Sequence, residues 1–317
     1  MVTKKVEETS PCRKKDLRTR LKQSKWQLYL FMLIPTVLVL LFNYYPMLGI
    51  QLAFKKFDFN LGIWGSPWIG FDNFEKFFNS YMFTRVLKNT LVLSFYTILV
   101  GFPIPIIFAL MIHSIPNLKY KKLVQTITYL PHFISVVVVV GIIMQLLNPT
   151  MGAIASICRW IGINDIPDVL SNPDAFPHLY VWSGIWQSMG WNSIIYIAAL
   201  SSVDPTYYEA ADIDGANRFH KLIYIDLPAI LPTAVMLLIM NAGSVMNIGF
   251  EKTFLMQNDL NLTTSEVIST YVYKVGMTGR SDFGYSTAIG LFNSVINFIL
   301  IVTVNKLSKR LSGNGLW

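Results

Sequence analysis

The sequence predicts an all-α, polytopic membrane protein with six transmembrane helices, and two observations lead to this fold class. First, 53% of the 317 residues are hydrophobic and only 14% are charged, whereas about a quarter of the residues in a soluble domain carry a charge. Second, the chain contains six apolar runs of 20 to 25 residues, and about 20 apolar residues let a helix cross a ~30 Å hydrocarbon layer. Backbone polar groups in lipid must be satisfied within their own segment, so each run is expected to be helical.

The expected spans contain no Asp, Glu, Lys or Arg up to residue 304. In chain order they cover residues 27–48, 89–112, 123–147, 179–200, 229–250 and 284–305. Several prolines inside them, among them Pro35, Pro103, Pro105 and Pro232, predict kinks or helix ends. The chain is therefore expected to consist of a transmembrane domain at 27–306 between two tails, 1–26 and 307–317.

The basic residues orient the chain in the membrane. Six spans place both ends of the chain on the same side as the loops 113–122 and 201–228. With the C-terminal end counted from residue 305, that side holds 17 Lys and Arg against 9 on the other. Lys and Arg collect on the cytoplasmic side, so both termini are expected in the cytoplasm. The same bias explains the net charge of +8 without nucleic acid as a partner, although the N-terminal tail could bind anionic membrane lipid.

Motifs for independent chemistry are missing from the sequence. It has no G-x-x-x-x-G-K-[ST] phosphate loop and no H-E-x-x-H zinc motif, so it is not expected to hydrolyse ATP by that route or to bind a metal. Carriers driven by protons or Na⁺ usually need ionisable groups within the bundle, and the six spans have none. If the protein moves a solute uphill, the energy is expected to enter through a cytoplasmic surface.

A polar segment at 204–228 lies between two of the most hydrophobic spans. Asp204-Pro205 predicts a helix start, because Pro is favoured in a first helical turn, and Gly215 predicts a turn. Pro228 and Pro232 are expected to end a second short helix before the next span. The segment is thus expected to form a helical hairpin across the end of the bundle, with a simple polar interfacial loop as the alternative.

This segment also matches a known motif at every position. Glu209-Ala210-Ala211, then Gly215, then Ile225 and Leu227-Pro228 fit the pattern E-A-A-x3-G-x9-I-x-L-P. The chain therefore resembles the permeases of ATP-binding-cassette (ABC) importers of type I. From about residue 28 to the C-terminus, stretches such as "YYPMLGIQLAFKKF" and "TYLPHFIS" resemble their carbohydrate-uptake branch, the LplB-like permeases for polysaccharides and oligosaccharides.

The resemblance implies a set of partners and a location. Such permeases are six-span subunits of the bacterial plasma membrane. They pair with a second, homologous permease and with two ATPase subunits, which bind the ATP and Mg²⁺, so that this chain itself would bind no cofactor. An extracellular solute-binding lipoprotein delivers the oligosaccharide.

The resemblance also implies roles in the loop, which would be the coupling loop that docks on the ATPase. Glu209 would contact the ATPase, Gly215 would form the turn, and Ala210 and Ala211 would allow a close approach. Asp214 and Ala216 belong to the D-G-A extension of the motif. These six residues are the expected ATPase-coupling site.

Amides and aromatic rings in the last three spans form a candidate substrate path, because proteins bind sugars through hydrogen bonds and stacked rings. The candidates are Trp186, Gln187, Trp191, Asn192, Asn241, Asn247, Asn293 and Asn297. The alternative is that the amides join helices and that the Trp rings lie at the membrane interface. Spans without charge suit a neutral glycan but also allow an anionic one, since the partner permease would line half of the route.

Three other functions remain as alternatives. The chain could be an ABC permease for a non-sugar solute, or an uncoupled channel or exporter subunit, against which the E-A-A motif argues. It could also be an intramembrane glycan-modifying enzyme. An enzyme would need acidic residues near the membrane face, and the candidates are Asp204, Glu209, Asp212 and Asp214, all of which the coupling loop already explains.

Overall fold

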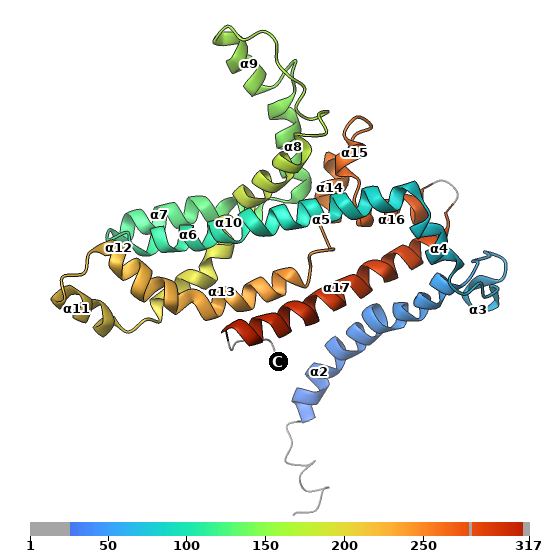
Figure 1. Cartoon of the computed structure of the whole chain (residues 1–317), viewed down its shortest axis with the longest axis horizontal. Coiled ribbons are helices and arrows are strands. Elements are labelled where there is room, and N and C mark those ends of the chain that lie inside the picture. The colour runs from blue at the N-terminus through green and yellow to red at the C-terminus, as the bar shows by residue number, and fades with distance from the viewer. Residues whose placement is uncertain (1–25, 279–280, 313–317) are drawn as a thin grey trace, which may run out of the picture. The chain divides into compact units, whose positions relative to one another are not determined.

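The computed structural model describes residues 26–278 and 281–312, and the chain divides into two units, Met1–Gln51 and Leu52–Trp317 (Figure 1). In the described residues the regular structure is helical, apart from one antiparallel bridge between Lys55 and Trp68. The all-helical membrane class predicted from the sequence is confirmed. The expected basic tail, except for Trp26, lies outside the described residues.

The described part of the first unit is a single apolar helical stretch. Helix α2 spans Trp26–Val39 and continues through a π-helical turn at Leu40–Tyr44 and a 3₁₀ segment at Tyr45–Phe54. Residues 29–48 are all exposed. A helix that is hydrophobic all round is typical of a membrane span.

The second unit contains the remaining helices. They are α3 (Gly62–Gly65), α4 (Asp72–Phe78), α5 (Tyr81–Gly101), α6 (Pro103–His113), α7 (Leu118–Tyr129), α8 (Val136–Leu147), α9 (Ala153–Trp160), α10 (Phe176–Ser201), α11 (Pro205–Ile213), α12 (Arg218–Lys221), α13 (Leu227–Ala242), α14 (Phe250–Met256), α15 (Leu262–Ser265), α16 (Ile268–Met277) and α17 (Phe283–Ser312). The end of α5 and the start of α6 meet at Phe102, next to Pro103.

Four helical stretches in the described residues are long and apolar enough to cross a membrane. They are Tyr29–Phe54, Tyr81–His113, Arg218–Ala242 and Phe283–Arg310. A fifth arises if the bent pair Leu118–Phe133 and Val136–Leu147 counts as one span. Helix α10 has 26 residues, enough at 1.5 Å per residue, but its Trp, Ser, Gln and Asn residues make it less apolar. The six expected spans are consistent with this arrangement.

The single helix expected at 123–147 is wrong, because the structure breaks it. Helix α7 and the 3₁₀ turn Leu130–Phe133 meet α8 at a bend of 98°. Pro131 lies in the 3₁₀ turn, and a proline within a helix removes a hydrogen bond and clashes with the preceding turn. Ser135 then begins α8 as its N-cap, accepting a hydrogen bond from the N–H of Val138.

The span expected at 229–250 is also shifted. The helical run begins at Arg218 and ends at Ala242, so Pro228 and Pro232 do not end the second short helix as predicted. A π-helical turn at Leu222–Asp226 directly precedes Pro228, and such local adjustments let membrane helices tolerate proline. The second half of the hairpin is therefore continuous with the span.

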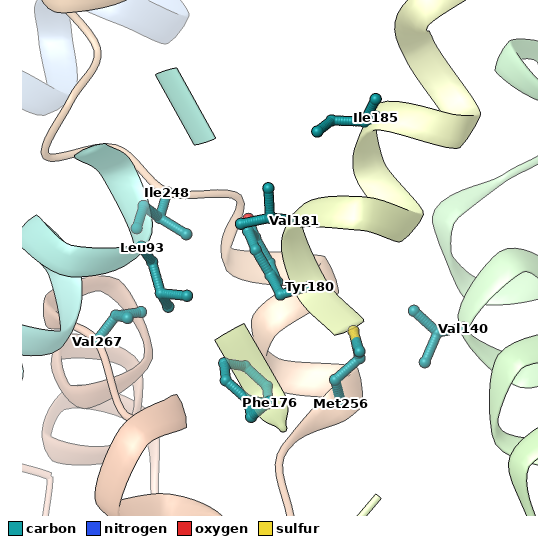
Figure 2. Packing of buried hydrophobic residues seen from close by; sticks show 9 residues of the cluster. All are labelled: Leu93, Val140, Phe176, Tyr180, Val181, Ile185, Ile248, Met256 and Val267. Carbon is teal, nitrogen blue, oxygen red and sulfur yellow. The ribbon is translucent and has the colours of Figure 1, made fainter. Parts of the chain in front are cut away.

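Helix α10 forms the centre of the second unit and packs against α6, α7 and α13. Gly190 allows the contact with α7, because a Cβ there would lie 2.3 Å from the carbonyl oxygen of Thr128. Figure 2 shows the main apolar cluster gathered around α10. Its buried members are Leu93, Val140, Phe176, Tyr180, Val181, Ile185, Ile248, Met256 and Val267.

Candidate functional site

A cavity of about 590 Å³ lies beside the middle of α10. Its wall is formed by α5, the start of α6, the break between α7 and α8, α10, the segment 241–249 and the start of α14. Two interruptions of helical structure, at 134–135 and 243–249, therefore meet at one cavity. In membrane proteins, irregular backbone is tolerated where it lines such a cavity or is buried in protein.

Half of the predicted substrate-path residues line this cavity: Gln187, Asn192, Asn241 and Asn247. The Gln187 side chain donates a 2.9 Å hydrogen bond to the carbonyl of Ile134, at the break between α7 and α8. The side-chain amides of Asn192 and Asn241 make no hydrogen bond to another described residue. These two amides are therefore available to a solute.

The other four candidates lie outside the cavity wall. Asn293 donates to Asn247 at 3.0 Å, and Asn297 accepts from the backbone N–H of Met246 at 2.9 Å and is buried. This is the helix-joining role that was the alternative for these amides.

The two tryptophan candidates do not line the cavity as stacking platforms for a sugar would. Trp186 is about half exposed and lies outside the wall. Trp191 stacks on His132 with ring centroids 4.5 Å apart, and it is His132 that lines the cavity. Trp191 thus supports a wall residue rather than facing the cavity itself.

Sequence reasoning missed Lys252, which brings a positive charge to the cavity wall. The spans are free of charge as expected, but Lys252 lies in α14, two residues beyond the last expected residue of the fifth span. Its ammonium donates a 2.7 Å hydrogen bond to the carbonyl of Tyr180. Burial lowers the pKa of Lys252 to about 8. The available signal in the sequence was a Lys two residues after a span, next to Glu251.

The predicted hairpin is present at 204–228. Asp204 is the N-cap of α11 and accepts a 2.9 Å hydrogen bond from the N–H of Thr206. This bond lowers the pKa of the Asp204 carboxyl. Figure 1 shows α11 and α12 at one end of the second unit.

The turn expected at Gly215 is a Schellman motif. Gly215 has a φ of +74°; its N–H donates to Asp212 at 3.2 Å, and the N–H of Ala216 donates to Ala211 at 2.8 Å. These two bonds satisfy the last carbonyls of α11 in the pattern that a left-handed residue permits.

The motif residues form an exposed surface on this hairpin. Glu209, Ala210, Asp214 and Gly215 are exposed, while Ala211 and Ala216 are partly buried. Ile213, which lies beside Asp212 and Asp214, is 88% exposed. Glu209 has no ion-pair partner among the described residues.

A buried polar cluster anchors the hairpin to the bundle. The Tyr208 hydroxyl donates a 2.5 Å hydrogen bond to Asp226, which is 4% exposed, and Nε2 of His113 lies 3.3 Å from the same hydroxyl. Burial and the Asp226 carboxylate raise the pKa of Tyr208, which keeps the phenol protonated. The cluster joins α11, the end of α6 and the π-helical turn before α13.

Asp212 makes a second tie within the hairpin, an ion pair with Lys221 of α12. Asp212 and Asp204 therefore both have hydrogen-bond or ion-pair partners within the loop. Of the four acids considered for an intramembrane enzyme, these two stabilise the structure of the loop.

The fold and this loop define a membrane component of a transport system, and comparison with known proteins agrees. Residues 82–313 match the family described as "Binding-protein-dependent transport system inner membrane component". Protein LplB of Bacillus subtilis (strain 168) is 41% identical over 297 residues, covering 94% of this chain and 92% of that protein. The polygalacturonan/rhamnogalacturonan transport system permease protein YteP of the same organism is 40% identical, with 96% and 94% covered.

Solved structures show the same fold. The crystal structure of a bacterial ABC transporter involved in the import of the acidic polysaccharide alginate contains a chain with a TM-score of 0.85 and 40% identity, covering 93% of this chain and 99% of that one. The chain therefore belongs to the family of binding-protein-dependent transport system inner membrane components. It is a multi-pass membrane protein and a transporter subunit rather than an enzyme.

Proposed function

We propose that this permease is one of two transmembrane subunits of an ABC importer for an oligosaccharide or polysaccharide fragment. An extracellular solute-binding lipoprotein would deliver the sugar, and a homologous second permease would complete the route. Two separate ATPase subunits would bind ATP and Mg²⁺ and dock on the coupling loop at 204–228. In this arrangement both termini lie in the cytoplasm, in agreement with the distribution of basic residues.

One observation carries the coupling proposal: a single helical run connects the motif loop to the cavity. It extends from Arg218 to Ala242, about 37 Å at 1.5 Å per residue, and Asn241 at its far end lines the cavity. The Tyr208–Asp226 hydrogen bond ties α11 to the start of this run. A movement of the docked loop would therefore be transmitted to the cavity wall by a rigid element.

The choice of a carbohydrate rests on the relatives and on the lining of the cavity. YteP is named for polygalacturonan and rhamnogalacturonan transport, and the structural relative is described as an importer of alginate. Free amides at Asn192 and Asn241 suit hydroxyl groups, which both donate and accept hydrogen bonds. A non-sugar solute is the alternative, and competition among solutes for uptake would distinguish the two.

Docking is tested by the pair Glu209→Ala and Asp165→Ala. Both remove one exposed acid, but Asp165 lies far from the motif in sequence, in the segment between α9 and α10. Removing a charge whose partner becomes buried at an interface costs about 2–5 kcal/mol, so the affinity of the ATPase for the Glu209→Ala complex is expected to fall at least tenfold, and sugar-stimulated hydrolysis with it. The Asp165→Ala complex is expected to bind the ATPase like the wild type. Equal ATPase binding by both variants would refute docking through Glu209.

A further inference from the structure

Lys252 is a buried cation in the wall of the cavity. Its side chain is 8% exposed, and its only hydrogen bond to a described residue is the one to the Tyr180 carbonyl. An ammonium has three N–H donors, so two remain without an acceptor in the described part of the chain. A buried charge is normally paired, because desolvation without a partner is costly.

No acid within the described residues pairs with Lys252 at 4.0 Å or less. Its neighbour Glu251 is exposed, and Glu266, which comes just before α16, is held by Lys274 at 2.9 Å. Helix α8, which packs against α14, has no titratable residue. The positive charge at the cavity is therefore not neutralised by the described part of this chain.

The wall around Lys252 is shaped to hold an ammonium group. The Tyr180 ring lies beneath it, with the Nζ atom 4.8 Å from the ring centroid, and aromatic faces attract cations. At Gly184, one turn further along α10, a Cβ would lie 3.1 Å from Nζ, so the absence of a side chain there leaves room for the ammonium. Tyr180 and Gly184 of α10 therefore hold the ammonium group at the cavity wall and not in the apolar core.

The contrast with another buried lysine supports this interpretation. Lys55 is 2% exposed, but its ammonium contacts two backbone carbonyls, those of Ile63 at 2.8 Å and Trp64 at 3.5 Å, and it is not part of the cavity wall. Lys55 is used to close a loop. Lys252 has fewer protein acceptors and an adjoining cavity.

We propose that the Lys252 ammonium binds a carboxylate of the transported oligosaccharide, which makes uronic-acid sugars the substrate class of this permease. The inference rests on the proposed function and specifies its substrate. A carboxylate accepts the unused N–H donors in a charge-assisted hydrogen bond, while the free amides of Asn192 and Asn241 in the same wall meet the sugar hydroxyls. A neutral sugar would leave the buried charge uncompensated.

The lowered pKa is consistent with this role. An opposite charge nearby favours the ionised form of a group, so a bound carboxylate would restore the ammonium that burial disfavours.

The test uses two sugars that differ only at their carboxyl groups: a galacturonic acid trimer, which is anionic, and its fully methyl-esterified form, which is neutral. Binding of each to the complete permease–ATPase complex in lipid nanodiscs is measured by calorimetry without the binding protein. This arrangement removes the selectivity of the binding protein from the result. The wild type is expected to bind the acid more tightly than the ester, and Lys252→Met is expected to weaken acid binding roughly tenfold or more while leaving ester binding unchanged.

Two further variants complete the design. Lys88→Met removes an exposed lysine outside the cavity and is expected to bind both sugars like the wild type. Gly184→Ala keeps the charge but places a methyl group close to Nζ, so it is expected to weaken binding of the acid and not of the ester. This variant replaces Lys252→Met in the test if Lys252→Met does not fold.

Three results would overturn the proposal: an equal loss of acid and ester binding in Lys252→Met, equal affinity of the wild type for both sugars, or no binding of either. ATP-dependent uptake of a neutral oligosaccharide in any of these cases would leave the importer function intact and refute only the role of Lys252.

Discussion

Replacing Gly215 tests whether the shape of the coupling loop matters for docking the ATPase. The residue has a φ of +74°, in the left-handed region where a Cβ lies too close to the following carbonyl. A Cβ added there would meet no atom within 4 Å beyond its own neighbours. The effect of a side chain is therefore conformational only, with no contribution from packing.

The magnitude follows from this geometry. A left-handed conformation costs an ordinary L-residue roughly 1–2 kcal/mol, which corresponds to a 5- to 30-fold lower population of the native turn. Gly215→Ala is expected near the lower end of this range and Gly215→Val at or above the upper end, because branching at Cβ adds crowding. Gly215→Asn is expected to lose the least, since Asn tolerates this conformation best among residues with a side chain.

The assay is ATPase binding to the permease pair in nanodiscs, with matched amounts of each variant. The dissociation constant is expected to increase in the order Gly, Asn, Ala, Val, and sugar-stimulated hydrolysis to decrease in the same order. If the Val variant bound like the wild type, or if Asn were as damaging as Val, the Schellman turn would not be what positions α11.

Three other predictions concern the burial of Lys252, the hydrogen bond between Tyr208 and Asp226, and the orientation in the membrane expected from the basic residues. At pH 7, Lys252→Met is expected to raise the melting temperature, because the lowered pKa of about 8 corresponds to a cost of roughly 3 kcal/mol for the buried ammonium, more than the ~1–2 kcal/mol of its one hydrogen bond. Tyr208→Phe is expected to destabilise the protein by roughly 1.5–3 kcal/mol in denaturant unfolding, since it removes a hydrogen bond to a buried carboxylate, whereas Asp226→Asn keeps an acceptor and is expected to lose less. The expected topology places Cys158 outside the cell and Cys12 in the cytoplasm. In intact cells, a membrane-impermeant thiol reagent is therefore expected to label Cys158 and not Cys12.

The outcomes that contradict these predictions are distinct. Below pH 8 Lys252 is charged in both the folded and the unfolded protein, so its cost is fully present; it disappears as pH rises towards the ordinary pKa of 10.5. The wild type is therefore expected to gain stability over this window and Lys252→Met is not, and equal pH dependence of the two would show that the burial cost is absent. A smaller loss for Tyr208→Phe than for Asp226→Asn would argue against the anchoring hydrogen bond, and labelling of Cys12 without lysis would reverse the orientation.

Hydrophobic patterning predicted the class and the approximate place of the long apolar helices, because length and apolarity are what lipid requires of a helix. It did not predict the 98° bend at 134–135. Pro131 was visible in the sequence, but a proline can either kink a membrane helix or be accommodated in it, as Pro232 is inside α13. Neighbouring helices decide between these outcomes, and their packing is not encoded in one segment.

The coupling loop was the most predictable part of the candidate site. Its geometry is local: the cap at Asp204 and the turn at Gly215 each depend on a few adjacent residues. The cavity was only partly predictable, because its wall brings together segments far apart in the chain. Counting charges within spans could not find Lys252, whose side chain reaches the cavity from the short helix α14.

The central claim is that this permease imports sugar only when its coupling loop transmits the work of a separate ATPase. The most direct measurement is uptake of a labelled galacturonic acid trimer into proteoliposomes that contain the permease pair and its ATPase, with the binding protein outside. Uptake against a gradient is expected with ATP inside. It is expected to stop when ATP is omitted or when the ATPase is left out, and to fall strongly when Glu209→Ala replaces the wild type. Accumulation that continued without ATP, or with the permease pair alone, would contradict the account.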